Sequence, residues 1–424
     1  MFNILCRSCI ALALALAAGL SGQALAAAPA KDGQTKAARA GAGQIKGSLV
    51  IIGGSLRTAN APVWERIVAL AGGRGARIAV FPSAANLPDR AGKLDVERLR
   101  AYGADAFLAP VSVKLAGTDY RELADDADIA RQVREAGGAY FVGGDQARIT
   151  QALRRPDGSN TLVLDALWDM YRRGGVIAGT SAGAAIMSSS MFNEAKPVLD
   201  TLKLGVNDGR ALAPGLGFIG EHVFVDQHLL VRGRFARMLP AMLHKGYKLG
   251  LGIDENTAMI VGPDREVEVL GYAGALLIEL GSATVDRFHP GFNMSNARMS
   301  YLDNGDRYNL ATGVFTPSAD KVAGGKIDRA KPYYRESLFS ADILGHTTVA
   351  QLMKKLVDSD QSEAVGIAFG GPKDVRPEQG FEFRFTMVPE SVGYNSAVTD
   401  GVSVFKLRMD IRPIEIRQPV YQYK

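Results

Sequence analysis

The chain has 424 residues, more than one compact domain usually needs, so we expect one large domain with an addition. Hydrophobic residues make up 47% and charged residues 22%, the usual proportions for a globular protein that buries a substantial core. The formal net charge of +5 is small for this length, and no dense run of Lys and Arg occurs, so we expect no nucleic-acid partner.

Residues 1–26 are predicted to be a secretory signal peptide. Arg7 precedes an apolar run over residues 10–20, and small residues occupy the cleavage positions up to Ala26. The apolar run is too short to cross a bilayer comfortably, which argues against a membrane anchor. We therefore expect cleavage after Ala26 and a secreted product, either periplasmic or extracellular.

Both cysteines, Cys6 and Cys9, lie inside this segment. The mature chain is therefore expected to contain no thiol and no disulfide, which excludes a cysteine nucleophile and a cysteine-ligated metal. Residues 27–46 are rich in Ala, Gly, Lys and Gln without apolar periodicity, and we interpret them as a flexible leader.

One domain is predicted over residues 47–294, where short apolar runs alternate with amphipathic segments. This alternation of strands and helices indicates an α/β fold with a doubly wound, mostly parallel sheet. The predicted strands cover 48–52, 77–81, 107–113, 138–142 and the run before Ser181, and the predicted helices cover 64–70, 94–102, 129–136 and 162–171.

Residues 295–424 are predicted to form a mostly β, α+β extension. Apolar residues recur at helical spacing over 349–357. Further on, Phe381, Phe383 and Phe385 alternate with charged residues, which indicates a half-buried strand. The same alternation joins Phe405, Leu407, Met409 and Ile411. The sequence assigns this extension no role.

A Gly-x-Ser-x-Gly pattern at residues 179–183 marks Ser181 as a candidate nucleophile. An apolar run precedes it and small helix-forming residues follow, which predicts a strand, a sharp turn and a helix. The helix start offers backbone N–H groups and partial positive charge to a developing oxyanion. Three other predicted strands also end in Gly- or Ser-containing loops, at Gly53-Gly54, Pro82-Ser83 and Gly143-Gly144. Ligands bind at such carboxyl ends in open α/β sheets.

A serine nucleophile needs a base, and His228 has the most suitable neighbours of the five histidines. It follows the apolar run 223–225, and alternation places Asp226 on the same side of that strand. The metal-binding alternative, formed by His222, Asp226 and His228, lacks a helical pair of histidines, so we expect no metal site.

Four carboxylates compete as the acid that orients the base. Glu255 lies in an acidic tip after the predicted strand at 249–253, and Glu194, Asp200 and Asp226 are the alternatives. Three arginines follow His228 at positions 232, 234 and 237, where they belong either to a solvated helix start or to a surface that recognises carboxylates.

Four motifs in chain order resemble the cyanophycinases, a serine peptidase family that also contains dipeptidase E. They are Phe141-Val142-Gly143-Gly144-Asp145-Gln146, Gly179-Thr180-Ser181-Ala182-Gly183-Ala184, Asp226-Gln227-His228 with Arg232-Gly233-Arg234, and Gly252-Ile253-Asp254-Glu255-Asn256-Thr257-Ala258. The resemblance covers residues 47–290, and the signal peptide and extension make the chain similar to secreted members.

The resemblance implies a fold related to class I glutamine amidotransferases, with Ser181 as nucleophile and His228 as base. Glu255 matches the third member, while descriptions of related peptidases place the acid nearer the serine, which leaves Glu194 and Asp200 open. The implied oxyanion hole consists of the Gly144 and Ala182 N–H groups. The implied substrate contacts are Gln146, Asp226, Gln227, Arg232, Arg234 and Arg237.

The implied activity is exopeptidase cleavage of cyanophycin, a polyaspartate with arginine on each side-chain carboxyl, to β-Asp-Arg dipeptides. No cofactor is implied, and a homodimer is suggested. Two alternatives remain: a dipeptidase for N-terminal aspartyl peptides, and a non-catalytic polymer-binding protein that uses the extension.

Overall fold

The computed structural model describes residues 45–417 and 419–420. The predicted signal peptide, both cysteines and all of the predicted leader except its last two residues lie outside the described residues. In the part of the chain that is described, no helix combines the length and the apolar character needed to cross a membrane.

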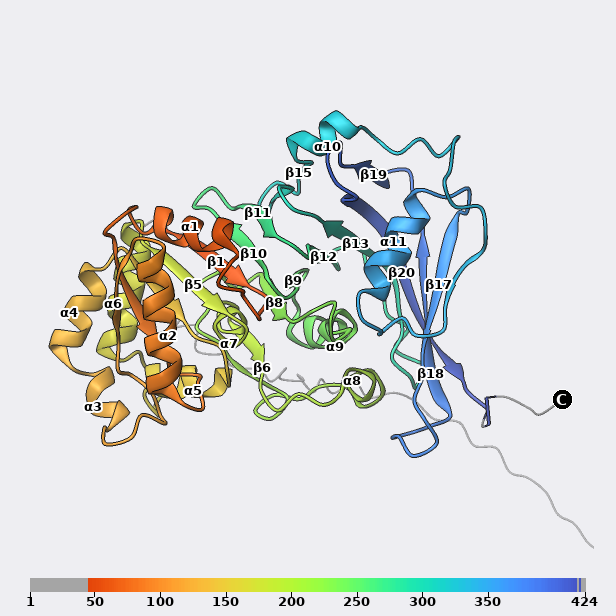
Figure 1. The fold of residues 1–424 in the computed structure, drawn as a ribbon. Coiled ribbons are helices and arrows are strands. Elements are labelled where there is room, and N and C mark those ends of the chain that lie inside the picture. The colour runs from red at the N-terminus through yellow and green to blue at the C-terminus, as the bar shows by residue number, and fades with distance from the viewer. Residues whose placement is uncertain (1–44, 418, 421–424) are drawn as a thin grey trace, which may run out of the picture. The chain divides into compact units, whose positions relative to one another are not determined.

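The described residues form two nine-stranded sheets (Figure 1). In the first sheet, strands β1 to β5 run parallel, and antiparallel strands extend the sheet beyond β1. In spatial order its strands are β15 (Phe315–Thr316), β14 (Arg307–Asn309), β11 (Glu266–Gly271), β10 (Thr257–Val261), β1 (Ser48–Ile52), β5 (Val176–Thr180), β4 (Gly138–Phe141), β2 (Arg77–Phe81) and β3 (Asp105–Leu108).

Helices cover both faces of this sheet, so the predicted doubly wound α/β fold is confirmed. Side chains of α1 and α2 pack on one face, and side chains of α4, α5 and α6 pack on the other. The helices are α1 (Ala61–Leu70), α2 (Pro88–Ala101), α3 (Tyr120–Ala124), α4 (Ala127–Glu135), α5 (Gln146–Leu153), α6 (Leu162–Arg173) and α7 (Ala182–Ala185).

The third strand is shorter than predicted. The sequence indicated a strand over 107–113, whereas β3 ends at Leu108. Pro110 follows closely, and proline has no N–H to donate to a strand ladder. Ala109 still donates its N–H to the carbonyl of Val80 in β2, and the chain from Pro110 onward leaves the sheet as a loop.

The second sheet is mostly antiparallel and combines strands from both predicted parts of the chain. Its order is β16 (Leu338–Ser340), β17 (Glu363–Ala368), β18 (Gln379–Thr386), β20 (Val402–Glu415), β13 (Met294–Leu302), β12 (Ala275–Glu279), β9 (Leu249–Ile253) and β8 (Val223–Gln227), with β19 (Val392–Asn395) also paired to β20. The remaining elements are β6 (Ser190–Phe192), β7 (Leu212–Pro214), α8 (Val198–Leu204), α9 (Phe235–Lys245), α10 (Ala319–Gly324) and α11 (Thr348–Val357).

The segment after residue 294 is built into both sheets. The expected boundary near residue 295 lies within β13, which pairs with β12 on one side and with β20 on the other. Strands β14 and β15 join the edge of the first sheet. The described residues accordingly belong to one compact unit. In Figure 1 the blue strands β17, β18 and β20 lie beside α11, whose apolar stripe packs on the second sheet.

The predicted apolar alternation in the extension is confirmed for β18 and only partly for β20. Phe381, Phe383 and Phe385 are fully buried in one cluster. In β20, Lys406 adopts a φ of +57°, and the alternation shifts there. Phe405 therefore stacks on Phe315, with ring centroids 4.7 Å apart, instead of joining Leu407 in the cluster on the second sheet.

Candidate active site

Ser181 occupies a strained turn between β5 and α7, as its Gly-x-Ser-x-Gly pattern predicts. Its backbone has φ +54° and ψ −106°, which a non-glycine residue rarely adopts. The flanking glycines are required sterically, because a Cβ at Gly179 would lie 2.3 Å from the Gly183 carbonyl oxygen. The Ser181 N–H donates to the carbonyl of Ile52 at 2.9 Å, which ties the turn to the end of β1.

His228 follows β8 and meets Ser181 at the boundary between the two sheets. Its Nε2 lies 2.9 Å from the Ser181 Oγ. Its backbone N–H donates to the carbonyl of Gly53 at 2.8 Å. The imidazole packs directly on Gly54, where a Cβ would lie 2.2 Å from the ring Cε1. His228 therefore depends on the turn after β1 for both its backbone and its ring position.

Glu255 is the carboxylate that contacts the base. It lies between β9 of the second sheet and β10 of the first, and its Oε1 is 2.5 Å from the His228 Nδ1. The next residue, Asn256, donates its N–H to the carbonyl of Gly54 at 2.8 Å. Asp254 accepts the N–H groups of Leu230 and Val231 and so holds the loop that follows His228.

The three competing carboxylates have other partners or other positions. Glu194 forms an ion pair with Arg210 at 3.1 Å, and its side chain is 67% exposed. Asp200 lies in the first turn of α8. Asp226 is buried and forms an ion pair with Arg237. Within the described residues, the hydrogen-bonded chain is therefore Ser181, His228 and Glu255.

The pKa shifts suit a neutral base next to an ionised acid. Burial lowers the pKa of His228 below its ordinary 6.5, although the hydrogen bond to Glu255 opposes this. Burial raises the pKa of Glu255, but hydrogen bonds from His228 and Ser55 more than compensate, so the net shift is downward. His228 at neutral pH therefore has Nε2 available to accept the Ser181 proton, while Nδ1–H donates to Glu255.

The two predicted oxyanion donors lie beside the nucleophile. Ala182 follows Ser181 at the first position of α7, and Gly144 lines the same cavity as Ser181. Among the described residues, neither backbone N–H has a hydrogen-bond acceptor. Gly144 has a φ of +147°, and a Cβ there would lie 2.1 Å from the Ala84 carbonyl oxygen, so this position requires glycine.

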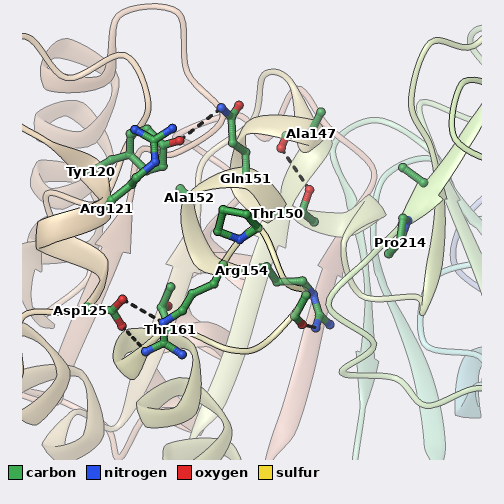
Figure 2. Close-up of a pocket in the computed structure, with 14 residues that line it drawn as sticks. Tyr120, Arg121, Asp125, Ala147, Thr150, Gln151, Ala152, Arg154, Thr161 and Pro214 are labelled. Atoms are coloured by element: carbon green, nitrogen blue, oxygen red, sulfur yellow. Dashed lines mark hydrogen bonds and ion pairs between the residues drawn. The ribbon is translucent and has the colours of Figure 1, made fainter.

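A cavity of about 360 Å³ opens beside Ser181 and His228. Its walls come from the turn after β1, from α2 and from the ends of β4 and β5. A second cavity, of about 560 Å³, is lined mainly by α3 and α5 and contains no member of the Ser181–His228–Glu255 chain (Figure 2). In this second cavity, Arg155 is paired with Asp125. We place the chemistry in the smaller cavity, beside Ser181 and His228, because the candidate nucleophile lies there.

The predicted substrate-binding residues separate into internally paired and accessible groups. Arg237 and Asp226 form two hydrogen bonds of 2.7 Å to each other in the interior. Arg234 donates to the carbonyl and the side chain of Gln227, both at 2.9 Å, and burial lowers its pKa to about 10.

Gln146 and Arg232 complete the predicted contacts. Gln146 donates to the carbonyl of Phe192 at 2.6 Å, whereas Arg232 is exposed. Arg232 is thus the member of this set most open to a ligand, and a direct substrate contact by each of the others stays a prediction.

Five residues of this site were not predicted from the sequence. Ser55 lines the catalytic cavity, and Asn256 accepts the N–H of Arg57 on its side-chain oxygen. Asn60 donates to the Asn256 carbonyl at 3.0 Å. Asp95 and Arg98 of α2 line the catalytic cavity. The Gly53-Gly54 loop, which Ser55 follows, is one of the loops predicted at strand ends. This position at the end of a strand was the sequence signal for its part in the site.

The alternative metal cluster is not assembled. His222 lies before β8 and His228 lies after it, so the two rings are at opposite ends of the strand. In the residues that the structure describes, no group of three or more His, Cys, Asp or Glu side chains is arranged to hold a metal ion.

Comparison with known proteins places this chain in a family. Residues 49–268, which include Ser181, His228 and Glu255, match the model of peptidase family S51. The chain is 32% identical over 279 residues to a cyanophycinase from Geminocystis herdmanii, covering 63% of this chain and 95% of that protein. It is 30% identical over 281 residues to a cyanophycinase from Synechococcus elongatus, covering 63% of this chain and 80% of that one. A solved peptidase from an acI-B1 Actinobacterium aligns with a TM-score of 0.46 at 21% identity, over 63% of this chain and 98% of that one.

The packing of His228 on Gly54 gives a direct test of the site geometry. Gly54→Ala introduces a Cβ into the imidazole, so the rate at which a fluorophosphonate labels Ser181 should fall by roughly 10²-fold. Gly73→Ala is the matched control, because Gly73 also has a positive φ of +88° but has nothing within 4 Å of the position that an added methyl group would take. Equal labelling rates for the two variants would contradict the proposed role of this turn.

Proposed function

The chain belongs to peptidase family S51, a family of serine-type peptidases, and we propose that it hydrolyses cyanophycin to β-Asp-Arg dipeptides. The observation that carries this proposal is the hydrogen-bonded chain from the Ser181 Oγ through His228 to Glu255. The relatives are cyanophycinases, which supports the choice of polymer. Their matched lengths support it further, because this chain covers 80–95% of those proteins.

The proposed reaction proceeds through an ester on Ser181. The Ser181 Oγ forms a bond to the scissile carbonyl carbon while its proton moves to the His228 Nε2. The oxyanion accepts hydrogen bonds from the Gly144 and Ala182 N–H groups. Collapse breaks the C–N bond, and the leaving amine takes the proton from His228.

Water completes the cycle. His228 takes a proton from water, and the resulting oxygen attacks the ester carbonyl carbon. The ester C–O bond then breaks, and His228 returns the proton to the Ser181 Oγ. The product leaves as a carboxylic acid, which ionises by losing the second proton of the water to the solvent. Glu255 remains ionised throughout and stabilises the imidazolium form of His228.

The chemistry of the polymer agrees with the charges near the site. Each repeat of cyanophycin carries a free α-carboxylate and a guanidinium, so it needs a cationic and an anionic partner. The exposed Arg232 is suited to the carboxylate, since arginine binds carboxylates through two parallel hydrogen bonds. Arg234 stands beside it and is held in place by Gln227.

Three further expectations remain proposals. We propose that residues 1–26 direct secretion and are then removed. Experiment then has to show whether the final location is the periplasm or the medium. We also propose a homodimer, as the sequence resemblance suggests. The extension is proposed to support catalysis structurally, because β13 pairs directly with β12, the neighbour of β9.

The activity can be tested with the mature protein and purified cyanophycin. The wild-type protein should release a soluble product with the mass of β-Asp-Arg, and Ser181→Ala should release none while keeping the wild-type circular dichroism spectrum. Asp-X dipeptides assayed in parallel distinguish the alternative dipeptidase activity. Release at the wild-type rate by Ser181→Ala would exclude Ser181 as the nucleophile, and cleavage of Asp-X dipeptides alone would exclude cyanophycin as the substrate.

The pH profile follows from the lowered pKa of His228. Only neutral His228 accepts the Ser181 proton, so kcat/KM should fall as the pH drops through an apparent pKa below 6.5. Glu255→Gln removes the charge that stabilises the imidazolium, so this apparent pKa should decrease further and kcat should fall by roughly 10²–10⁴-fold.

Glu194→Gln is the control for this profile, because Glu194 is an exposed carboxylate that was an alternative candidate for the acid. It should leave both kcat and the apparent pKa unchanged. An apparent pKa above 6.5 for the wild-type protein, or a loss of activity in Glu194→Gln like that in Glu255→Gln, would contradict the assignment.

A further inference from the structure

An ion pair on α2, formed by the buried Asp95 and the partly exposed Arg98, lines the same cavity as the nucleophile. Asp95 is 5% exposed, and the Arg98 Nη1 donates to its Oδ1 at 2.8 Å. Both residues contribute to the wall of the 360 Å³ cavity that also contains Ser181, His228 and Gly144. The pair is therefore inside the reaction cavity and not on the solvent face of the helix.

A carboxylate is unexpected at the position of Asp95. The buried face of α2 otherwise consists of Pro88, Gly92, Val96 and Leu99. Burying an ion pair costs free energy, and an apolar residue would pack there without that cost. The buried carboxylate thus indicates a requirement that packing alone does not explain.

The hydrogen bonding of this pair is incomplete. Among the described residues, Arg98 is the hydrogen-bond donor to Asp95, although an ionised carboxylate can accept about four hydrogen bonds. The Arg98 Nε is buried without an acceptor, and the Thr180 Oγ1 on the cavity wall is also without a partner. The cavity therefore presents an anionic group with unused acceptor capacity to whatever occupies it.

The other walls suit an aliphatic stem that ends in a planar cation. Leu56, Ala91, Leu94 and Val142 provide an apolar surface, and Tyr140 provides an aromatic one. Of the described residues that line the cavity, Asp95 is the carboxylate. Arg232 and Arg234 do not line this cavity, so the carboxylate-binding arginines and Asp95 address different parts of a bound substrate.

We propose that Asp95, oriented by Arg98, is the subsite that binds the guanidinium of a substrate arginine next to the scissile bond. This inference rests on the proposed function and names the residue that gives it selectivity for arginine-bearing polymer. Burial raises the pKa of Asp95, whereas the hydrogen bond and the charge of Arg98 oppose that shift, and the same hydrogen bond fixes the orientation of the carboxylate. The substrate guanidinium then donates to the acceptor positions that Arg98 leaves unused.

The test compares two synthetic peptides with a polyaspartate backbone, one with arginine and one with citrulline on the side-chain carboxyls. Citrulline keeps the shape of arginine and removes its charge. The wild-type protein should prefer the arginine peptide in kcat/KM by about tenfold or more, because hydrogen bonds between charged groups are strong. Asp95→Asn should remove this preference, so that the ratio of the two kcat/KM values falls to about one.

Two further variants make the test specific. Asp89→Asn is the matched control, because Asp89 lies on the same helix but pairs with Lys93 in solvent, and it should keep the wild-type preference. Ala91→Lys adds a cation four residues before Asp95 on the partly exposed cavity rim, so it should occupy the subsite and abolish the preference without removing the buried charge. Equal fluorophosphonate labelling of Ser181 in each variant establishes an intact nucleophile.

The outcomes separate the two proposals. If the wild-type protein cleaves the arginine peptide, and both Asp95→Asn and Ala91→Lys retain its preference over citrulline, the subsite is wrong and the proposed function stands. If the wild-type protein cleaves neither peptide, the proposed function is wrong and the subsite fails with it. If Asp89→Asn loses the preference as Asp95→Asn does, the effect belongs to the charge of the helix and the subsite is again wrong.

Discussion

Three consecutive carbonyl groups at the end of β1 hold the catalytic site together. Those of Ile52, Gly53 and Gly54 accept the N–H groups of Ser181, His228 and Asn256 at 2.9, 2.8 and 2.8 Å. Each of these donors belongs to a separate loop that ends a different strand. Because unpaired buried backbone groups are costly, these bonds couple Ser181, His228 and the loop that carries Glu255 to one short turn. The absence of a side chain at Gly54 then makes room for the imidazole.

The turn after β1 can bind all three loops because it lies where the two sheets meet. Ser181 leaves the first sheet at β5, His228 leaves the second sheet at β8, and Glu255 lies where the chain crosses from β9 to β10. The parallel pairing of β8 with β9 brings Gln227 opposite Ile253, so His228 and Glu255 emerge at the same edge. Strands from the C-terminal segment complete the second sheet, and the position of the base therefore depends on residues far from it in sequence.

The sequence predicted the local parts of this arrangement better than the long-range ones. The doubly wound fold and the turn at Ser181 followed from apolar periodicity and from glycine spacing, which act within a few residues. The contact of Glu255, and not Glu194 or Asp200, with His228 depends on the register between β8 and β9, which no local pattern contains. Asp95 and Arg98 looked like ordinary helix charges, because only the docking of α2 decides which face is buried. Phe405 also lies outside the cluster on the second sheet that its alternation with Leu407 predicts, because Lys406 adopts a positive φ.

The most direct test of this mechanism is to trap the ester on Ser181. The wild-type protein is mixed with cyanophycin, quenched in acid within milliseconds, digested, and measured by mass spectrometry. We expect an added acyl group of the substrate on the peptide that contains Ser181, formed before or together with the first dipeptide released. An adduct on a different residue, or a burst of dipeptide with Ser181 unmodified at every time point, would contradict the mechanism.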